Sequence, residues 1–128
     1  MNRTIENNNL KVTVSDNGAE LVSVWDKKRN VERIWRGDAA VWGRHAPVLF
    51  PFVGKVAEGK YSYKGREYKM TSHGFARDRE FDFVGIDEDN MSVTHVLRWS
   101  EKSLAIYPFK FALYVKHNFA DKNSSSVN

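Results

Sequence analysis

The sequence contains no cysteine among its 128 residues, which excludes disulfides, thiolate catalysis and zinc sites built from cysteine. It also lacks a long apolar run. The longest one, residues 46–53, includes two of the three prolines and is far too short to cross a bilayer. The first nine residues are polar, without the apolar core of a secretory signal. These absences favour a soluble, cytoplasmic protein with no membrane partner.

Motifs for several classes of site are also missing. The four histidines do not have a metal-binding spacing such as His-Glu-x-x-His, and no Gly-x-Ser-x-Gly nucleophile element occurs. The acidic run at 87–90 stands between two expected strands, which favours a turn over a calcium loop. We therefore expect neither a metal nor a cofactor.

Charge of one sign is not concentrated anywhere in the sequence. The formal net charge is +4, but lysines and arginines are mixed with acids, as in residues 26–29 and 78–80. This mixture favours a solvated surface over a nucleic-acid interface.

What the sequence does have is an alternation of apolar and polar residues with a period of two, which predicts strands. Aromatic residues make up 13% of the chain and supply material for a folded core. Lys64-Gly65 predicts a hairpin with a two-residue loop, which sets Tyr61 opposite Tyr68. Other strands are expected at residues 10–15, 19–25, 31–35, 80–86, 91–99 and 109–119, with a short helical turn at 38–44. The fold class predicted is all-β, an antiparallel β-sandwich or barrel.

The carboxyl end of the sequence indicates an interrupted sheet. A turn at 120–123 follows the expected strand at 109–119, and residues 124–128 could begin a further strand. Because a strand without its partner leaves an open edge, we expect a truncated chain that can self-associate through exposed strand edges.

Residues 72–78, Ser-His-Gly-Phe-Ala-Arg-Asp, bring together the side chains best suited to chemistry. His73 titrates near neutral pH and can donate to an oxygen of a ligand. Gly74 allows close approach of the backbone, and Arg77 carries a fixed fork of donors that suits neighbouring hydroxyls. In isolation this pattern still favours a structural or surface role for His73. His45 is expected at the surface, whereas His95 and His117 are in phase with apolar strand faces and are expected to be buried and hydrogen-bonded.

Several motifs occur in an order that is characteristic of one family. They are Trp42, Ala-Pro-Val-Leu-Phe-Pro at 46–51, Gly54, the hairpin at 61–70, His-Gly-Phe-Ala-Arg at 73–77 and Tyr-Pro-Phe-Lys-Phe at 107–111. This set resembles the LacX-like branch of the aldose 1-epimerase (galactose mutarotase-like) family over nearly the whole chain. The resemblance implies a galactose mutarotase-like supersandwich, with residues 1–128 as the amino-terminal portion of a single domain. It also implies a hexose substrate, whose α and β anomers are interconverted without a cofactor.

The resemblance also assigns roles to individual residues. His73 takes the place of the family's first active-site histidine, which contacts the sugar ring, and Arg77 would be a substrate contact or a support beside it. Lys55 falls near an arginine that binds sugar hydroxyls in many members; lysine keeps the charge but loses the bidentate fork. Core packing explains most of the tryptophans, and Trp42 is the one most expected to contact the sugar because it adjoins the proline-containing segment.

Two parts of the family's catalytic set are missing from this sequence. Opening the sugar ring needs a base for the proton of the anomeric hydroxyl and an acid for the ring oxygen. The family places a second histidine in a later His-Pro segment and a glutamate base near its carboxyl terminus, and neither motif occurs here. The resemblance therefore implies an amino-terminal part that is inactive alone.

Two other functions stay open at this point. A non-catalytic carbohydrate-binding module would bind sugar without any effect on the rate of mutarotation. A nucleic-acid-binding β-barrel would bind oligonucleotides with an affinity that falls steeply with salt.

Overall fold

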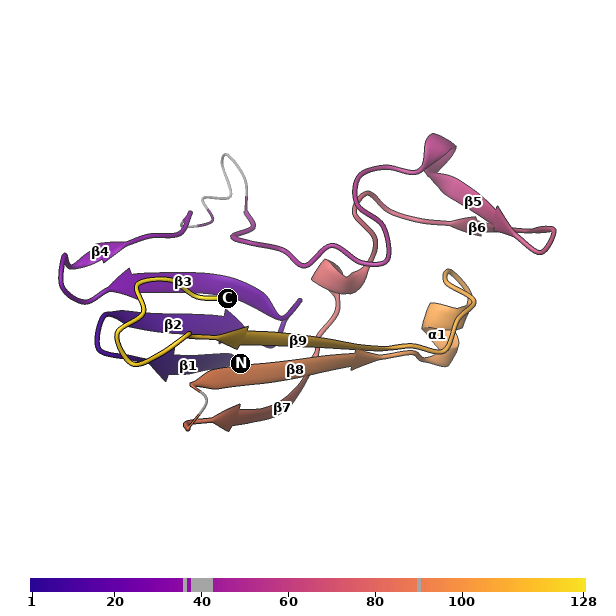
Figure 1. Ribbon diagram of the computed structural model, residues 1–128. Helices are drawn as coiled ribbons and strands as arrows, with labels where there is room; N and C mark the ends of the chain where they lie inside the picture. The colour runs from indigo at the N-terminus through magenta and orange to yellow at the C-terminus, as the bar shows by residue number, and fades with distance from the viewer. Residues whose placement is uncertain (36, 38–42, 90) are drawn as a thin grey trace.

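The computed structural model describes residues 1–35, 37, 43–89 and 91–128. Within these residues the secondary structure is mainly antiparallel strands, which confirms the predicted fold class (Figure 1). One sheet contains, in spatial order, β1 (Asn2–Glu6), β2 (Leu10–Ser15), β3 (Glu20–Asp26) and β4 (Val31–Glu32). A second contains β7 (Asp82–Asp87), β8 (Ser92–Arg98) and β9 (Ala112–Asn118), and a separate hairpin contains β5 (Lys60–Tyr63) and β6 (Arg66–Lys69).

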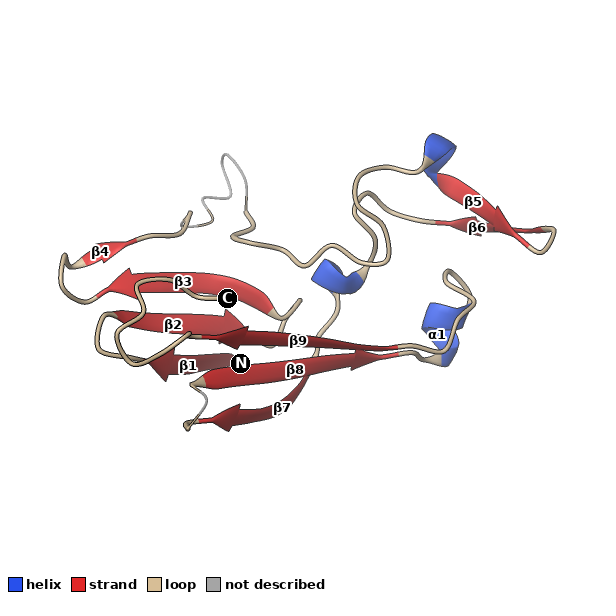
Figure 2. Cartoon of the chain, in the orientation of Figure 1, coloured by secondary structure: helices blue, strands red, loops and turns tan. Residues whose placement is uncertain are grey.

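The helical elements are short and lie in the connections (Figure 2). They are the 3₁₀ turns η1 (Ala57–Gly59) and η2 (Ala76–Asp78) and the single α-helical turn α1 (Glu101–Leu104). In the described part of the chain, no helix has the length and apolar character needed to cross a membrane.

The main core lies where the two larger sheets pack against each other. Alternate residues of β2 are buried, as its period of two predicts. These β2 residues pack against one residue from β1, one from β8 and the residue that follows β9. The buried cluster is Ile5, Leu10, Val12, Val14, Val93 and Phe119. A second, smaller cluster of Ala19, Ala76 and Phe81 extends this core toward η2.

A buried group of charges connects the same sheets. Arg3 of β1 donates two hydrogen bonds to the Asp16 carboxylate (3.1 and 2.9 Å), and His95 of β8 places Nε2 2.8 Å from it. His95 is fully buried, so its expected role as a buried, hydrogen-bonded histidine is confirmed. His117 is half-buried, and this burial lowers the pKa of its ring. The hydrogen bond expected for His117 is not seen at Nδ1, which has no partner in the described residues.

The structure differs from the sequence prediction at several elements. The strand expected at 31–35 covers only Val31–Glu32. Residues 2–6 form a strand that was not predicted, because Ile5 is its only buried apolar residue. The strand expected from residue 109 begins at Ala112 instead. The expected helical turn at 38–44 lies almost entirely outside the described residues.

The carboxyl-terminal segment does pair with β9, as expected of a strand that begins there. Asn118 and Asn128 exchange two backbone hydrogen bonds (3.0 and 2.8 Å), and Phe119 forms a bridge with Val127.

The β5–β6 hairpin extends away from the packed sheets (Figure 1). Tyr61 pairs with Tyr68 and their rings stack with centroids 5.4 Å apart, which confirms the predicted register. The segment that leads into the hairpin and the one that leaves it run side by side, and Phe50 and Gly74 form a parallel bridge between them. The segments that carry the predicted site therefore meet at the base of this hairpin.

Candidate functional site

The His-Gly-Phe segment is seated directly on the Ala-Pro-Val-Leu-Phe-Pro segment. The backbone N–H groups of Phe75 and Ala76 both donate to the carbonyl oxygen of Phe50 (2.9 and 3.2 Å). Gly74 has φ of +79°, and a Cβ at this position would collide with the same carbonyl. Glycine is therefore required here both for its conformation and for the close approach of the two backbones.

His73 is held by Gly54 through two hydrogen bonds of opposite direction. The His73 backbone N–H donates to the Gly54 carbonyl oxygen (2.7 Å), and the Gly54 backbone N–H donates to His73 Nδ1 (2.8 Å). Both residues have positive φ, +62° at His73 and +82° at Gly54. The imidazole is half-buried, and Nε2 is the ring nitrogen left for a ligand.

The segment 71–77, which we call the His73 loop, is closed by further hydrogen bonds. Gly74 N–H donates to the Thr71 carbonyl oxygen (3.0 Å), and the Thr71 hydroxyl donates to the Gly74 carbonyl oxygen (2.9 Å). One guanidinium N–H of Arg77 donates to the Ser72 carbonyl oxygen (2.9 Å). In this structure Arg77 therefore supports the loop that carries His73, while its buried Nε has no partner within the described residues.

The other candidate residues differ in how close they lie to this loop. Lys55 follows Gly54 directly, is exposed, and has no ion pair among the described residues. Trp42 lies outside the described residues. His45 is half-buried, and its Nδ1 lies 3.7 Å from the Glu20 carboxylate. Of the predicted residues that the structure describes, His73 and Arg77 thus share one loop, in which Arg77 binds the carbonyl of Ser72 beside His73.

A cluster of aromatic rings underlies the site. Phe50 and Phe75 pack edge to face, with Tyr107 and Phe111 against both, at centroid separations of 5.2 to 6.2 Å. The three motifs that are far apart in the sequence therefore converge on one cluster. The sequence indicated the motifs but not this packing, because aromatic residues outside a strand carry no periodic signal.

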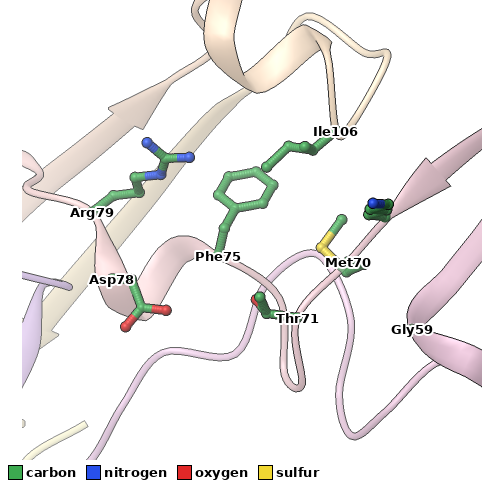
Figure 3. Close-up of a pocket in the computed structure, with 8 residues that line it drawn as sticks. Gly59, Met70, Thr71, Phe75, Asp78, Arg79 and Ile106 are labelled. Carbon is green, nitrogen blue, oxygen red and sulfur yellow. The ribbon is translucent and has the colours of Figure 1, made fainter.

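A cavity beside the loop is lined by Thr71 and Phe75 but not by His73. It has a volume of about 360 Å³ and lies between the hairpin, η2 and the turn after α1 (Figure 3). Its lining residues are Gly59, Lys69, Met70, Thr71, Phe75, Asp78, Arg79 and Ile106. His73, Arg77 and Lys55 do not line it. Phe75 supplies an aromatic wall, with the Arg79 guanidinium 5.8 Å from its ring centroid, and such walls suit the apolar face of a sugar.

Comparison with known proteins identifies the family. The LacX protein of Lactococcus lactis is 29% identical over 124 residues, which are 93% of this chain and 40% of that protein. Among solved structures, a galactose mutarotase related enzyme from Lactobacillus acidophilus is 42% identical, with a TM-score of 0.91. A galactose mutarotase-like protein from Lactobacillus casei is 37% identical, with a TM-score of 0.88.

These matches cover nearly all of this chain but less than half of each relative. The two structural matches cover 96% and 94% of this chain but 40% of each solved chain. This chain thus spans about 40% of the length of the relatives that it matches. The aldose 1-epimerase family matches residues 1–128, and the chain therefore belongs to the aldose 1-epimerase family.

Proposed function

We propose that this chain binds a hexopyranose against the His73 loop and supplies the first histidine of a site that interconverts the α and β anomers. The observation that supports it best is the seating of His73. One hydrogen bond with Gly54 holds its backbone and the other holds its ring at Nδ1, which leaves Nε2 for a ligand. Membership of the aldose 1-epimerase family supports the substrate class.

The chemistry required is the opening and closing of the sugar ring. A base removes the proton of the anomeric hydroxyl while the ring oxygen accepts a proton, so the bond between C1 and the ring oxygen breaks and an open aldehyde forms. Rotation about the bond from C1 to C2 and closure then give the other anomer. Lys55 lies next to Gly54 and is exposed, so it is placed to bind sugar hydroxyls beside His73.

We further propose that residues 1–128 are the amino-terminal portion of one mutarotase-like sandwich domain. The chain spans about 40% of its relatives, and its sequence lacks the family's later His-Pro segment and late glutamate. A chain with this set of residues binds the sugar but lacks the glutamate base and the second histidine. We therefore expect binding without faster mutarotation.

Calorimetry and polarimetry on the same preparation test this proposal. Galactose and glucose are titrated into the wild-type chain and into His73→Asn, and the optical rotation of each fresh sugar is followed with and without protein. We expect measurable binding to the wild-type chain, an affinity at least about tenfold lower for His73→Asn, which corresponds to about 1.4 kcal/mol, and an unchanged rate of mutarotation. Equal affinities of the two proteins, or no binding, would contradict the site. A faster rotation change would contradict the inactivity of the chain alone.

A further inference from the structure

We infer that the backbone N–H of Gly54 is a positioning group that fixes the His73 imidazole with its hydrogen on Nε2. His73 then meets a bound sugar as a hydrogen-bond donor and not as a base. The meaning of this arrangement for catalysis rests on the proposed function, whereas the arrangement itself does not.

The direction of the hydrogen bond between Gly54 and His73 determines which ring nitrogen carries the hydrogen. A backbone N–H can only donate, so the Nδ1 atom that lies 2.8 Å from the Gly54 nitrogen must accept. A neutral imidazole carries one hydrogen, which then stands on Nε2. A ring turned by 180° would set a C–H group against the Gly54 N–H, so one bond selects both the tautomer and the ring orientation.

Other hydrogen bonds hold both His73 and Gly54 in place. The bond from the His73 N–H to the Gly54 carbonyl oxygen closes a reciprocal pair. On the other side, the loop is fixed by the Thr71–Gly74 bonds and by the contact of Arg77 with Ser72. Gly74 itself is seated against the Phe50 carbonyl. These bonds hold the His73 backbone and the Gly54 N–H in fixed positions, so the donor stays where Nδ1 can accept from it.

The position of this hydrogen limits what His73 can do in the reaction. A neutral imidazole with its hydrogen on Nε2 has no free lone pair in the plane of the ring on that nitrogen, so it cannot take the proton of the anomeric hydroxyl. It donates a hydrogen bond to the ring oxygen or to a hydroxyl and keeps its own hydrogen. The proton that leaves the hydroxyl and the one that reaches the ring oxygen must therefore be carried by other groups, and His73 polarises and orients the sugar.

Nitrogen-15 NMR on the labelled chain tests the tautomer directly. Long-range correlation of ring hydrogens with ring nitrogens at neutral pH distinguishes a protonated from an unprotonated nitrogen, and His45 in the same spectrum is the reference ring. We expect an unprotonated Nδ1, a protonated Nε2, and a scalar coupling across the hydrogen bond between the Gly54 nitrogen and Nδ1. A hydrogen on Nδ1 of neutral His73 overturns the inference, whether or not the chain binds sugar.

Two substitutions separate positioning from ligand binding. His73→Asn keeps an acceptor oxygen near the place of Nδ1 and tolerates positive φ, so we expect the Gly54 amide to exchange with solvent as slowly as in the wild type. His73→Ala has no acceptor, and we expect at least tenfold faster exchange of that amide. Equal exchange in all three proteins overturns the inference. The expected tautomer together with no sugar binding supports the positioning role and overturns the proposed function instead.

Discussion

Two glycines of the candidate site share a positive φ and differ in the space around them. Gly54 and Gly74 have φ of +82° and +79°. A Cβ added at Gly54 meets no atom within 4 Å, whereas one at Gly74 collides with the Phe50 carbonyl. The pair therefore separates the cost of backbone conformation from the cost of steric conflict.

Alanine substitution at these positions gives a matched comparison. We expect Gly54→Ala to lower the free energy of unfolding by about 1–2 kcal/mol, the cost of a left-handed conformation for a residue with a side chain. Gly74→Ala adds steric conflict with rigid backbone, so we expect a total loss of about 2–5 kcal/mol. Urea unfolding measures both. A smaller loss at Gly74 than at Gly54 would show that the two segments are not packed as described.

Asp16 makes the stability of the fold depend on acid. The hydrogen bonds from Arg3 lower the pKa of this carboxyl most; burial opposes them, and the contact with His95 also lowers it. A carboxyl with a lowered pKa in the folded state contributes stability that is complete above its unfolded value of about 3.9. That contribution is lost as pH falls through the lower, folded value.

We therefore expect the free energy of unfolding of the wild-type chain to fall between about pH 4 and the lowered pKa of Asp16. Asp16→Asn should lose about 2–3 kcal/mol at neutral pH, because it removes charged hydrogen bonds from a buried position. It should also flatten the acid side of the profile. Thermal unfolding at a series of pH values measures both effects, and an unchanged profile in the variant would exclude Asp16 as the titrating group.

At the scale of elements, the β5–β6 hairpin is attached to the rest of the molecule at few points. The Tyr61 hydroxyl donates to the Ile106 carbonyl oxygen (2.5 Å), and its ring packs between Phe52 and Tyr68. This contact joins the hairpin to the turn after α1, beside the cavity of Figure 3.

Removal of this hydroxyl tests the attachment. We expect Tyr61→Phe to lower the free energy of unfolding by about 1 kcal/mol, the net value of one hydrogen bond, and to speed amide exchange in β5 and β6. Tyr63→Phe is the control, since Tyr63 is exposed and its hydroxyl makes no hydrogen bond within the described residues. Similar effects of the two changes would mean that the hairpin is not attached through Tyr61.

The sequence predicted elements well where periodicity or turn chemistry is strong, as in β2 and the Tyr61–Tyr68 hairpin. It missed β1, whose single buried residue gives no alternation. It placed the start of β9 too early, because Phe109 and Phe111 continue the apolar alternation. Phe111 belongs to the aromatic cluster instead, and Phe109 packs against Tyr63 and Tyr107. The bond between Gly54 and His73 was also beyond prediction, since it depends on positive φ at both residues.

At the scale of the whole molecule, the ordered motifs identified the family and the fold, and the comparisons confirm both. The surface that meets the ligand was not settled in the same way. His73 and Arg77 lie in one loop and Lys55 lies next to Gly54, whereas the described cavity opens on Phe75 and Arg79. We propose that a hexose binds at the loop and not in this cavity.

The most direct measurement is a map of backbone amide shifts as galactose or glucose is added to the labelled chain. We expect the largest changes at Gly54, Lys55, His73 and Arg77, none of which lines the cavity, and their loss in His73→Asn. Changes centred on the cavity residues Gly59, Lys69 and Ile106, with Gly54 and His73 unaffected, would contradict it.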